Sequence, residues 1–409
     1  MHVARSTNAL GGTGASDLFQ LLRDGVPKSR TELAGLTGLA RSTVNDRLSA
    51  LAQLGLIGPA TAGASTGGRP PRRVALLPDA RLALAVDLGA SHVRLAVVNL
   101  LNAQLNTYEE PLDIASGPEA VLTQVMRRAD ELLVELSRSR EDVMAVGIGL
   151  PGPVHFETGR PARPPIMPGW DGFDVPGWFH QHLAAPVLVD NDVNLMALGE
   201  HSRLARPVEH FLFVKVATGI GAGIISGGRL QRGAQGIAGD IGHVRVRSGD
   251  GVYCHCGNEG CLEAVASGSR LADRLRRAGR QDVLGGRDVV SLVDSGDLEA
   301  IRAVRQAGRD LGEVLAASIS FLNPEVIAVG GRMAGAGEHL LAGVREVVYQ
   351  RAMPLATQRL DIHTATQSRD AGLLGASLLA LHHALSPEGI DALAEATPAE
   401  TTPAETTPA

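Results

Sequence analysis

Three cysteines and one histidine form the most specific chemical pattern in this sequence. Cys254, Cys256 and Cys261 lie close together, and His243 precedes them at the end of Gly239-Asp240-Ile241-Gly242-His243. Three thiols and one imidazole suit a closed tetrahedral zinc site, in which four protein ligands leave no position for a reactive water. We therefore expect these four residues to hold a structural Zn²⁺ ion. The alternative is three buried free cysteines, which their clustering disfavours.

Two turns between apolar strands have the composition of phosphate-binding loops. The first contains Asp87-Leu88-Gly89-Ala90-Ser91-His92, and the second contains Thr218-Gly219-Ile220-Gly221. Backbone N–H groups and a hydroxyl in such turns can point at a phosphate, with an aspartate near a metal ion. A third strand ends at Gly330-Gly331, where glycines would allow close approach of an adenosine. Ordinary tight turns are the alternative in each case. The candidate nucleotide-binding residues are Asp87, Gly89, Ser91, Thr218, Gly219, Gly221, Gly330 and Gly331.

A carboxylate also stands at the end of a candidate strand. Residues 186–190 are mostly apolar and lead into Asn191-Asp192-Val193-Asn194, after which a helical segment follows. A carboxylate at a strand end, beside a helix N-terminus, is well placed to take a proton from a bound hydroxyl. Asp192 is therefore a candidate general base. The alternative is that these residues serve only as a helix N-cap.

The elements that would position these residues are typical of an α/β protein. A length of 409 residues is enough for two or three domains with cores of their own. The composition, with 44% hydrophobic and 20% charged residues, is that of a globular protein. Residues 81–385 alternate β-branched runs, glycine turns and helical patterns. Residues 386–409 end in Thr-Pro-Ala-Glu repeats and predict a disordered tail. No apolar run could span a membrane, the N-terminus lacks a signal core, and the few cysteines favour a reduced cytosol.

Residues 1–80 have the pattern of a winged helix-turn-helix. Leu18, Leu21 and Leu22 predict a first helix, and Ser29-Arg30-Thr31-Glu32 predicts a capping box, with Leu33 and Leu36 on the buried face of a second. A third helix would bury Val44, Leu48, Leu51 and Leu54. Two strands around a Gly/Pro/Arg loop would form the wing. The alternative is a small helical bundle with a solvated basic loop.

Charge supports DNA binding by this module. Nine of the 38 basic and five of the 44 acidic residues lie in residues 1–80, a net charge of +4, against −10 for the remainder. The third helix opens with hydrogen-bonding side chains, as a recognition helix does, and an arginine in the wing could enter a narrow minor groove. The candidate DNA-contacting residues are Arg41, Ser42, Thr43, Asn45, Arg47 and Arg69.

Taken in order, these motifs resemble the ROK family of repressors, open reading frames and sugar kinases. The resemblance covers about residues 10–385, and the winged module is similar to that of the repressor-type members. It implies an actin-like ATPase body of two ribonuclease H-like lobes with a sugar in the cleft. It also implies that Asp192 is the base of the kinases and that the sugar contacts are Asn191, Asp192, Asp240, His243 and Glu263. Gly169-Trp170 resembles the loop that closes over the sugar.

The first phosphate turn departs from the kinase pattern of this family. Kinases usually read Asp-x-Gly-Gly-Thr-Lys, whereas this chain has Ala90 and His92 at the second glycine and the lysine. Because phosphoryl transfer depends on positioning and charge stabilisation, the change argues against catalysis. We therefore expect a sugar-responsive transcriptional repressor, acting in the cytoplasm as a homodimer or homotetramer on operator DNA, with a sugar or sugar phosphate as effector. The alternative is an ATP-dependent sugar kinase, which would need ATP and Mg²⁺.

Overall fold

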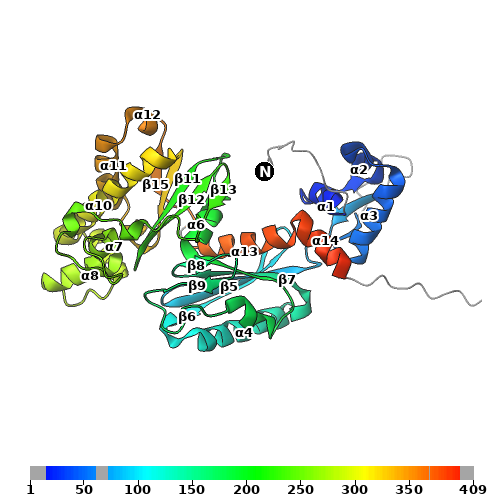
Figure 1. Cartoon of the computed structure of the whole chain (residues 1–409), viewed down its shortest axis with the longest axis horizontal. Coiled ribbons are helices and arrows are strands. Elements are labelled where there is room, and N and C mark those ends of the chain that lie inside the picture. The colour runs from blue at the N-terminus through cyan, green and yellow to red at the C-terminus, as the bar shows by residue number, and fades with distance from the viewer. Residues whose placement is uncertain (1–14, 61–71, 368, 397–409) are drawn as a thin grey trace, which may run out of the picture.

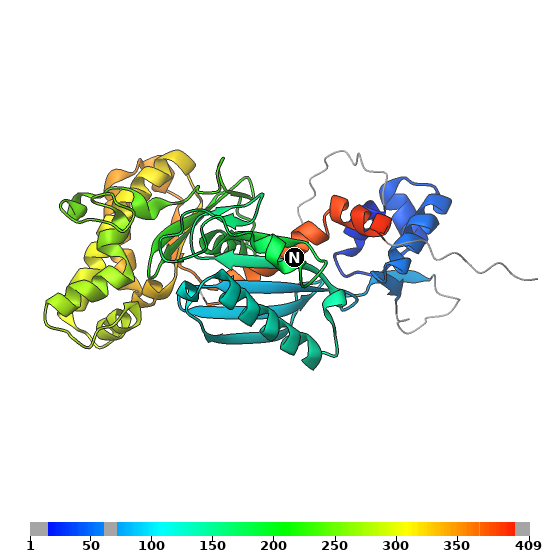
Figure 2. The same cartoon turned by 60° about the horizontal axis from the view of Figure 1, so that its bottom comes forward.

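A computed structural model describes residues 15–60, 72–367 and 369–396 of the chain. Figures 1 and 2 show three parts in a row: a small N-terminal module, a first lobe built on one sheet, and a second lobe built on another. The N-terminal module contains α1 (Ser16–Leu22), β1 (Lys28–Ser29), α2 (Arg30–Thr37), α3 (Arg41–Gln53), β2 (Ile57–Pro59) and β3 (Arg73–Leu76).

The two lobes contain the remaining elements. The first lobe contains β4 (Leu82–Leu88), β5 (His92–Asn99), β6 (Gln104–Pro111), α4 (Pro118–Glu135), β7 (Val143–Leu150), β8 (Val154–His155), β9 (Arg160–Pro161), α5 (Val175–His180) and β10 (Val187–Asn191). The second lobe contains β11 (Phe211–Val216), β12 (Ile220–Ser226), β13 (Arg229–Gln231), α7 (Leu262–Ala266), α8 (Gly268–Arg277), α9 (Gly286–Asp294), α10 (Leu298–Leu322), β14 (Val326–Gly330), α11 (Glu338–Arg351), α12 (Pro354–Thr357) and β15 (Asp361–Thr364). Three further helices are α6 (Asp192–His201), α13 (Ala371–Ala384) and α14 (Pro387–Ala396).

Both lobes have the same sheet topology. The strand order is β10-β7-β4-β5-β6 in the first lobe and β13-β12-β11-β14-β15 in the second. In each, the first three strands in chain order pair antiparallel, and the next two are added parallel to the first. This repeated arrangement is the two-lobed, actin-like fold that the sequence led us to expect. It places the turns after β4 and β11 at equivalent positions in the two lobes.

Alternation of side chains along the strands explains how each sheet packs. In β4, Leu82, Leu84 and Val86 face a core that includes α4, whereas Ala83 and Ala85 face a core that includes α13. The small alanines allow α13 to lie close to the sheet. In the second lobe, one face of β11 packs on α8, α10 and α11, and the other packs on α6.

Helices α6 and α13 pack directly on each other between the two sheets (Figure 1). A Cβ at Gly375 would collide with the Leu195 carbonyl, and one at Gly199 with the Ala371 carbonyl, so both glycines permit close backbone approach. Glu200 is completely buried and accepts hydrogen bonds from Thr366 N (2.6 Å) and Gln367 N (2.8 Å). These contacts fix the start of α13 to α6.

The N-terminal module is a winged helix, as predicted. Glu32 N donates to Ser29 Oγ (3.2 Å) and Ser29 N donates to Glu32 Oε2 (2.6 Å), which completes the expected capping box. β3 pairs antiparallel with both β1 and β2, and the wing loop between β2 and β3 lies mostly outside the described residues. Val44, Leu48, Leu51 and Leu54 are buried. The expectation for Leu36 was wrong: it is 53% exposed because the face of α2 that packs is centred on Leu33.

The prediction of a disordered tail from residue 386 is wrong for residues 387–396. Residues 387–396 form α14, which lies against α1 (Figure 2). Gln20 Nε2 donates to the Leu385 carbonyl (2.6 Å), and Ser16 Oγ donates to Asp391 Oδ2 (3.2 Å). The composition of the tail obscured this helix, since its partner is at the other end of the chain. The remaining tail residues, 397–409, lie outside the described residues.

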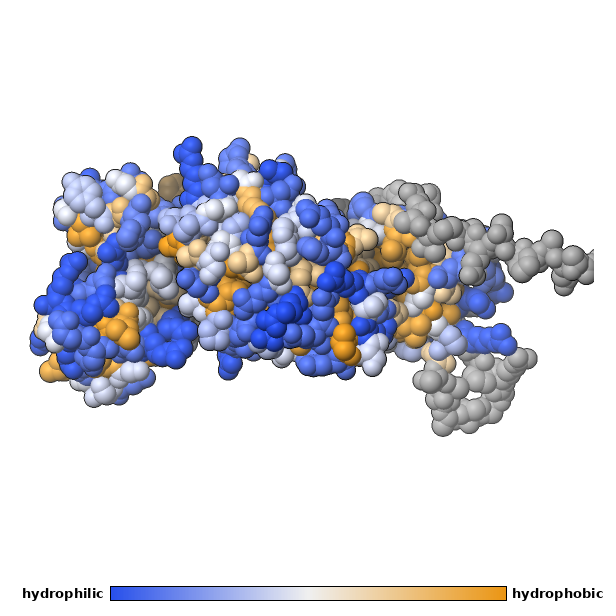
Figure 3. Space-filling view, turned by 90° about the horizontal axis from the view of Figure 1, so that it is seen from below, coloured by the Kyte–Doolittle hydropathy of each residue, from blue (hydrophilic) through white to orange (hydrophobic). Residues whose placement is uncertain are grey.

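The exterior of the lobes is mixed in character. In the view of Figure 3, hydrophobic residues form small groups among hydrophilic ones. Within the described residues, no helix combines the length and the apolar character needed to cross a bilayer.

Candidate sugar cleft, metal cluster and DNA-facing helix

Acidic residues gather where the parallel strands of the first lobe end. In the sheet register, Gly149 on β7 lies between Asp87 on β4 and Asp190 on β10. Asn191 then caps α6: its Oδ1 accepts from Val193 N (2.9 Å) and Asn194 N (3.3 Å), and its Nδ2 donates to the Gly152 carbonyl (2.9 Å). Asn191 is therefore the N-cap residue of α6, as the alternative interpretation proposed. Asp192 follows as the first residue of the helix.

Asp192 forms an ion pair with a residue that sequence reasoning missed. Lys215 Nζ, from β11 of the second lobe, lies 2.5 Å from Asp192 Oδ2, and Asp192 is only 4% exposed. Burial lowers the pKa of Lys215, but the charges of Asp192 and Asp87 outweigh that and raise it overall. Burial raises the pKa of Asp87, and the charge of Asp192 raises it further. Asp87, Asp192 and Lys215 thus form one electrostatic cluster, and the expected base is already paired.

A second ion pair between the lobes lies next to this one. Arg232 Nε donates to Asp190 Oδ2 (2.7 Å), and its guanidinium lies 3.7 Å from the centroid of the Phe156 ring. Asn194 Nδ2 donates to the other oxygen of Asp190 (2.8 Å). The two acids that flank Asn191 are therefore each held by a cation from the second lobe. The sequence offered no local indication of either pair.

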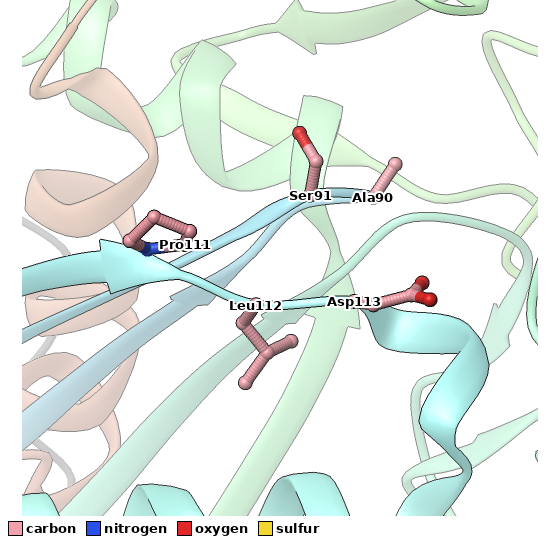
Figure 4. A pocket seen from close by; sticks show the side chains of 5 residues that line it. All are labelled: Ala90, Ser91, Pro111, Leu112 and Asp113. Atoms are coloured by element: carbon pink, nitrogen blue, oxygen red, sulfur yellow. The ribbon is translucent and has the colours of Figure 1, made fainter.

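The first phosphate turn is partly covered by its own histidine. A Cβ at Gly89 would collide with the His92 ring, so the ring lies directly over the glycine. The carbonyls of Ala90 and Ser91 accept from Ile114 N (3.3 Å) and Leu112 N (3.2 Å). Figure 4 shows the Ser91 and Ala90 side chains on the side of the turn away from Leu112. The turn after β4 forms as expected, and the His92 ring covers its Gly89.

The second phosphate turn is also in contact with other side chains of the protein. Glu263 Oε2 accepts from Ile220 N (3.0 Å) and would lie 2.6 Å from a Cβ at Gly219. A Cβ at Gly221 would contact Val193, and one at Gly331 would meet the Val216 backbone, while Gly330 pairs with Lys215 in the sheet. Thr218 is exposed. Glu263, expected to contact sugar, therefore fixes this turn in the structure.

The predicted metal ligands converge. Ligand atoms of His243, Cys254, Cys256 and Cys261 all lie within 4.8 Å of one another. His243 Nδ1 is 3.7 Å from Cys254 Sγ, and Cys256 Sγ is 3.6 Å from Cys261 Sγ. Tetrahedral zinc–thiolate bonds of about 2.3 Å place ligand sulfurs roughly 3.8 Å apart, so this cluster fits the ion. Burial raises the pKa of the Cys261 thiol to about 12, which a bound cation would offset.

The cluster adjoins two expected sugar ligands. His243 Nδ1 faces Cys254, while its Nε2 lies 3.9 Å from Asp240 Oδ1. Burial raises the pKa of Asp240. One edge of the imidazole is thus available to a metal and the other faces the acid. Trp170, by contrast, is completely buried and donates from Nε1 to the Ile114 carbonyl (3.1 Å), so it packs in the core of the first lobe.

The exposed start of α3 carries most of the candidate DNA contacts. Arg41, Ser42 and Asn45 are exposed and Thr43 is half-buried. The expectation for Arg47 differs from the structure: its side chain is 12% exposed and lies 3.6 Å from Asp17 Oδ2, because it faces α1. Arg69 lies outside the described residues.

Comparison with known proteins agrees with this geometry. A model of the ROK family matches residues 83–383. The chain belongs to the ROK family. A ROK transcriptional regulator, described as a homolog of the Escherichia coli MLC protein, superimposes with a TM-score of 0.76 at 26% identity and covers 93% of this chain and 97% of its own. A ROK glucokinase from Streptomyces griseus has a TM-score of 0.64 at 26% identity and covers 73% of this chain and 99% of its own.

Relatives of known sequence fall into the same two groups. A glucokinase from Halalkalibacterium halodurans is 30% identical over 311 residues, covering 72% of this chain and 94% of that protein. A putative xylose repressor from a Caldicellulosiruptor species is 28% identical over 360 residues, covering 85% of this chain and 90% of that protein. The matches with these regulators therefore extend over more of this ROK chain than the matches with the kinases.

Proposed function

We propose that this protein is a transcriptional repressor that responds to a sugar. One observation carries the proposal: a winged helix, in which α3 begins with exposed polar residues, is packed onto the first lobe of a ROK body. Leu18, Phe19 and Leu22 of α1 share an apolar core with Leu381 of α13, with Leu385 and with Ala83 of β4 in the first lobe. The matches to proteins named as repressors extend beyond the ROK body and support the same reading.

In this proposal the cleft binds the sugar with side chains from both lobes. Asp192 has one oxygen on Lys215 and can accept a sugar hydroxyl at the other. Asn191, Asp240, His243 and Glu263 complete the set, and a Zn²⁺ ion held by His243 and the three cysteines would supply rigidity. Because the metal fixes the His243 ring, it orients a sugar ligand and takes no part in chemistry.

The winged module would contact operator DNA through the start of α3. Arg41, Ser42, Thr43 and Asn45 are positioned to reach base edges and phosphates. A two-fold operator would require a homodimer or homotetramer with half-sites spaced by whole helical turns. Such a repressor would act in the cytoplasm, where the DNA is.

Helices α13 and α14 offer a continuous route from the cleft to the winged module. The first turn of α13 contacts Asp87, its middle packs on α6, and α14 packs on α1. A sugar that binds the closed cleft more tightly than the open one would shift α13 and, with it, α1. Differential affinity for the two conformations would drive the response.

Two assays on the full-length protein test the proposal. A thermal-shift screen of hexoses, pentoses and N-acetylated amino sugars should find a sugar that stabilises the protein, since a specific ligand stabilises the native state by mass action. Selection from random duplexes should recover a two-fold sequence. Absence of either a sugar or a DNA ligand would refute the proposal.

The second candidate is a sugar kinase. It is favoured by Asp192 at the start of α6 and by the 30% identity to a glucokinase. The residues present do not fit a metal nucleotide well, since His92 covers the first phosphate turn and Lys215 engages Asp192. A coupled assay with ATP, Mg²⁺ and the stabilising sugar decides the matter: turnover that disappears in Asp192→Asn would establish the kinase.

A further inference from the structure

Lysine is very rare in this chain, and one of its lysines lies in the cleft. The sequence has 38 basic residues counted as Lys and Arg, and only Lys28 and Lys215 are lysines. Lys28 pairs with Asp24 at the surface of the winged module. The other 36 of these residues are all arginine. The use of lysine at 215 therefore calls for a reason specific to that site.

The position of Lys215 in the sheet explains how it reaches the first lobe. It stands near the carboxyl end of β11, and its cross-strand neighbours are Gly221 on β12 and Gly330 on β14. Neither neighbour has a side chain to crowd the ammonium group. Its Nζ lies 2.5 Å from Asp192 Oδ2, and the Lys215 side chain is 23% exposed.

Asp87 on β4 lies close to Asp192, with Gly149 of β7 near both acids. A Cβ at Gly149 on β7 would lie 3.7 Å from both Asp87 Oδ1 and the Asp192 Cα, so the absence of a side chain there leaves the two acids close to each other. The charge of Asp87 raises the pKa of Lys215 together with that of Asp192. The ammonium group thus pairs directly with Asp192, and Asp87 lies close enough for its charge to act on the same pair.

We propose that Lys215 determines what this cleft can bind: its ammonium group is the resident counter-ion of Asp87 and Asp192 and takes the place of a divalent cation. Oxygen ligands from carboxylates are what Mg²⁺ and Mn²⁺ require, and here they are already neutralised in part. The ammonium of lysine is a compact point charge like a metal ion, whereas the guanidinium of arginine is wide and planar. The cleft therefore binds its sugar without a metal nucleotide.

The role of His92 is consistent with this inference. Its ring covers Gly89 in the turn that follows Asp87, and its charge, when protonated, would also act on that carboxylate. His92 and Lys215 thus occupy neighbouring parts of the region where phosphates and their metal would lie. Nucleotide binding would then be lost because the His92 ring fills this region and the Lys215 ammonium neutralises its carboxylates.

Removal of Lys215 should create a divalent cation site. In isothermal titration with Mn²⁺, the zinc-loaded full-length Lys215→Met protein should bind at least tenfold more tightly than wild type. The Lys28→Met control, which removes the other lysine, should behave like wild type. Adding Asp87→Asn to Lys215→Met should abolish the gain. Equal Mn²⁺ affinity in wild type and Lys215→Met, or a gain that survives Asp87→Asn, would overturn the proposal.

A thermal-unfolding measurement covers the case in which Lys215→Met folds poorly. Mn²⁺ should raise the melting temperature of Lys215→Met and leave those of wild type and Lys28→Met unchanged. Equal shifts in all three proteins, or no shift in Lys215→Met, would contradict the inference.

A measurement on unmutated protein provides a second test, and this one rests on the proposed function. The affinity for the stabilising sugar should be the same, within twofold, in metal-depleted buffer and in buffer with Mg²⁺ and a non-hydrolysable ATP analogue. A change of fivefold or more would overturn the proposal. Metal ions should be removed from the buffer with a resin before the protein is added, because a chelator left in the buffer would also take zinc from the protein. Should no sugar bind at all, the proposed function fails, whereas the Mn²⁺ titration still tests the role of Lys215.

Discussion

Gly372, in the first turn of α13, lies against the carboxylate of Asp87: a Cβ at position 372 would stand 2.7 Å from Asp87 Oδ2. This contact joins the cleft to the helix that continues, through α14, to the winged module. The same helix lies on the alanine face of β4 and against α6. Two consecutive helices therefore link the acidic cluster, which α13 contacts, with the winged module, which α14 contacts.

Gly372→Ala should destabilise the protein, because the new methyl group must displace either Asp87 or α13. We expect a loss of about 1–3 kcal/mol in the free energy of unfolding, as for overpacked sites. Urea denaturation measures it. Gly35→Ala is the matched control: it also lies in a helix, its Cβ would meet no atom within 4 Å, and it should be neutral or stabilising. A Gly372→Ala protein as stable as wild type would contradict the described contact.

Ile390→Ala should uncouple α14 from the winged module. Ile390 is completely buried and shares a core with residues of α1, so truncation should cost about 2–4 kcal/mol. DNA affinity should also lose its dependence on sugar, measured by fluorescence anisotropy with a labelled duplex. Glu388→Ala, an exposed change on the same helix, should leave both properties intact. Normal sugar control in a folded Ile390→Ala protein would remove α14 from the route.

Arg41 and Arg47 should differ in effect, although both lie on α3. Arg41 is exposed, so Arg41→Ala should weaken DNA binding by about 1–3 kcal/mol and leave unfolding unchanged. Arg47 faces Asp17, so Arg47→Ala should mainly lower the unfolding temperature. Duplex titration and thermal melting separate the two effects. If Arg41→Ala lowered the unfolding temperature and Arg47→Ala weakened DNA binding, α3 would contact DNA with its other face.

Cys256→Ser should remove the metal. Purified wild type should contain one zinc per chain by elemental analysis, whereas Cys256→Ser should contain none, melt at a lower temperature and lose sugar affinity. His255→Ala is the matched control, since His255 lies between two ligands but outside the cluster. Full sugar affinity in a zinc-free protein would show that the cluster does not position His243.

The sequence predicted those features that depend on neighbours in the chain. The Ser29–Glu32 capping box, the cysteine cluster and the turn after β4 are local, and each forms as expected. Contacts between distant segments could not be predicted: Lys215 with Asp192, Arg232 with Asp190, and Arg47 with Asp17. The rarity of lysine was the one available indication of Lys215. Helix α14 was missed because its stability depends on α1, some 370 residues earlier.

The most direct test of the account measures the coupling between sugar and DNA. The affinity of full-length protein for its selected duplex should fall at least tenfold at a saturating concentration of the stabilising sugar. Bound duplex should weaken sugar binding by the same factor, as linkage requires. Asp192→Asn should keep its DNA affinity and lose this response. A sugar that binds wild type tightly and leaves its DNA affinity unchanged would contradict the account.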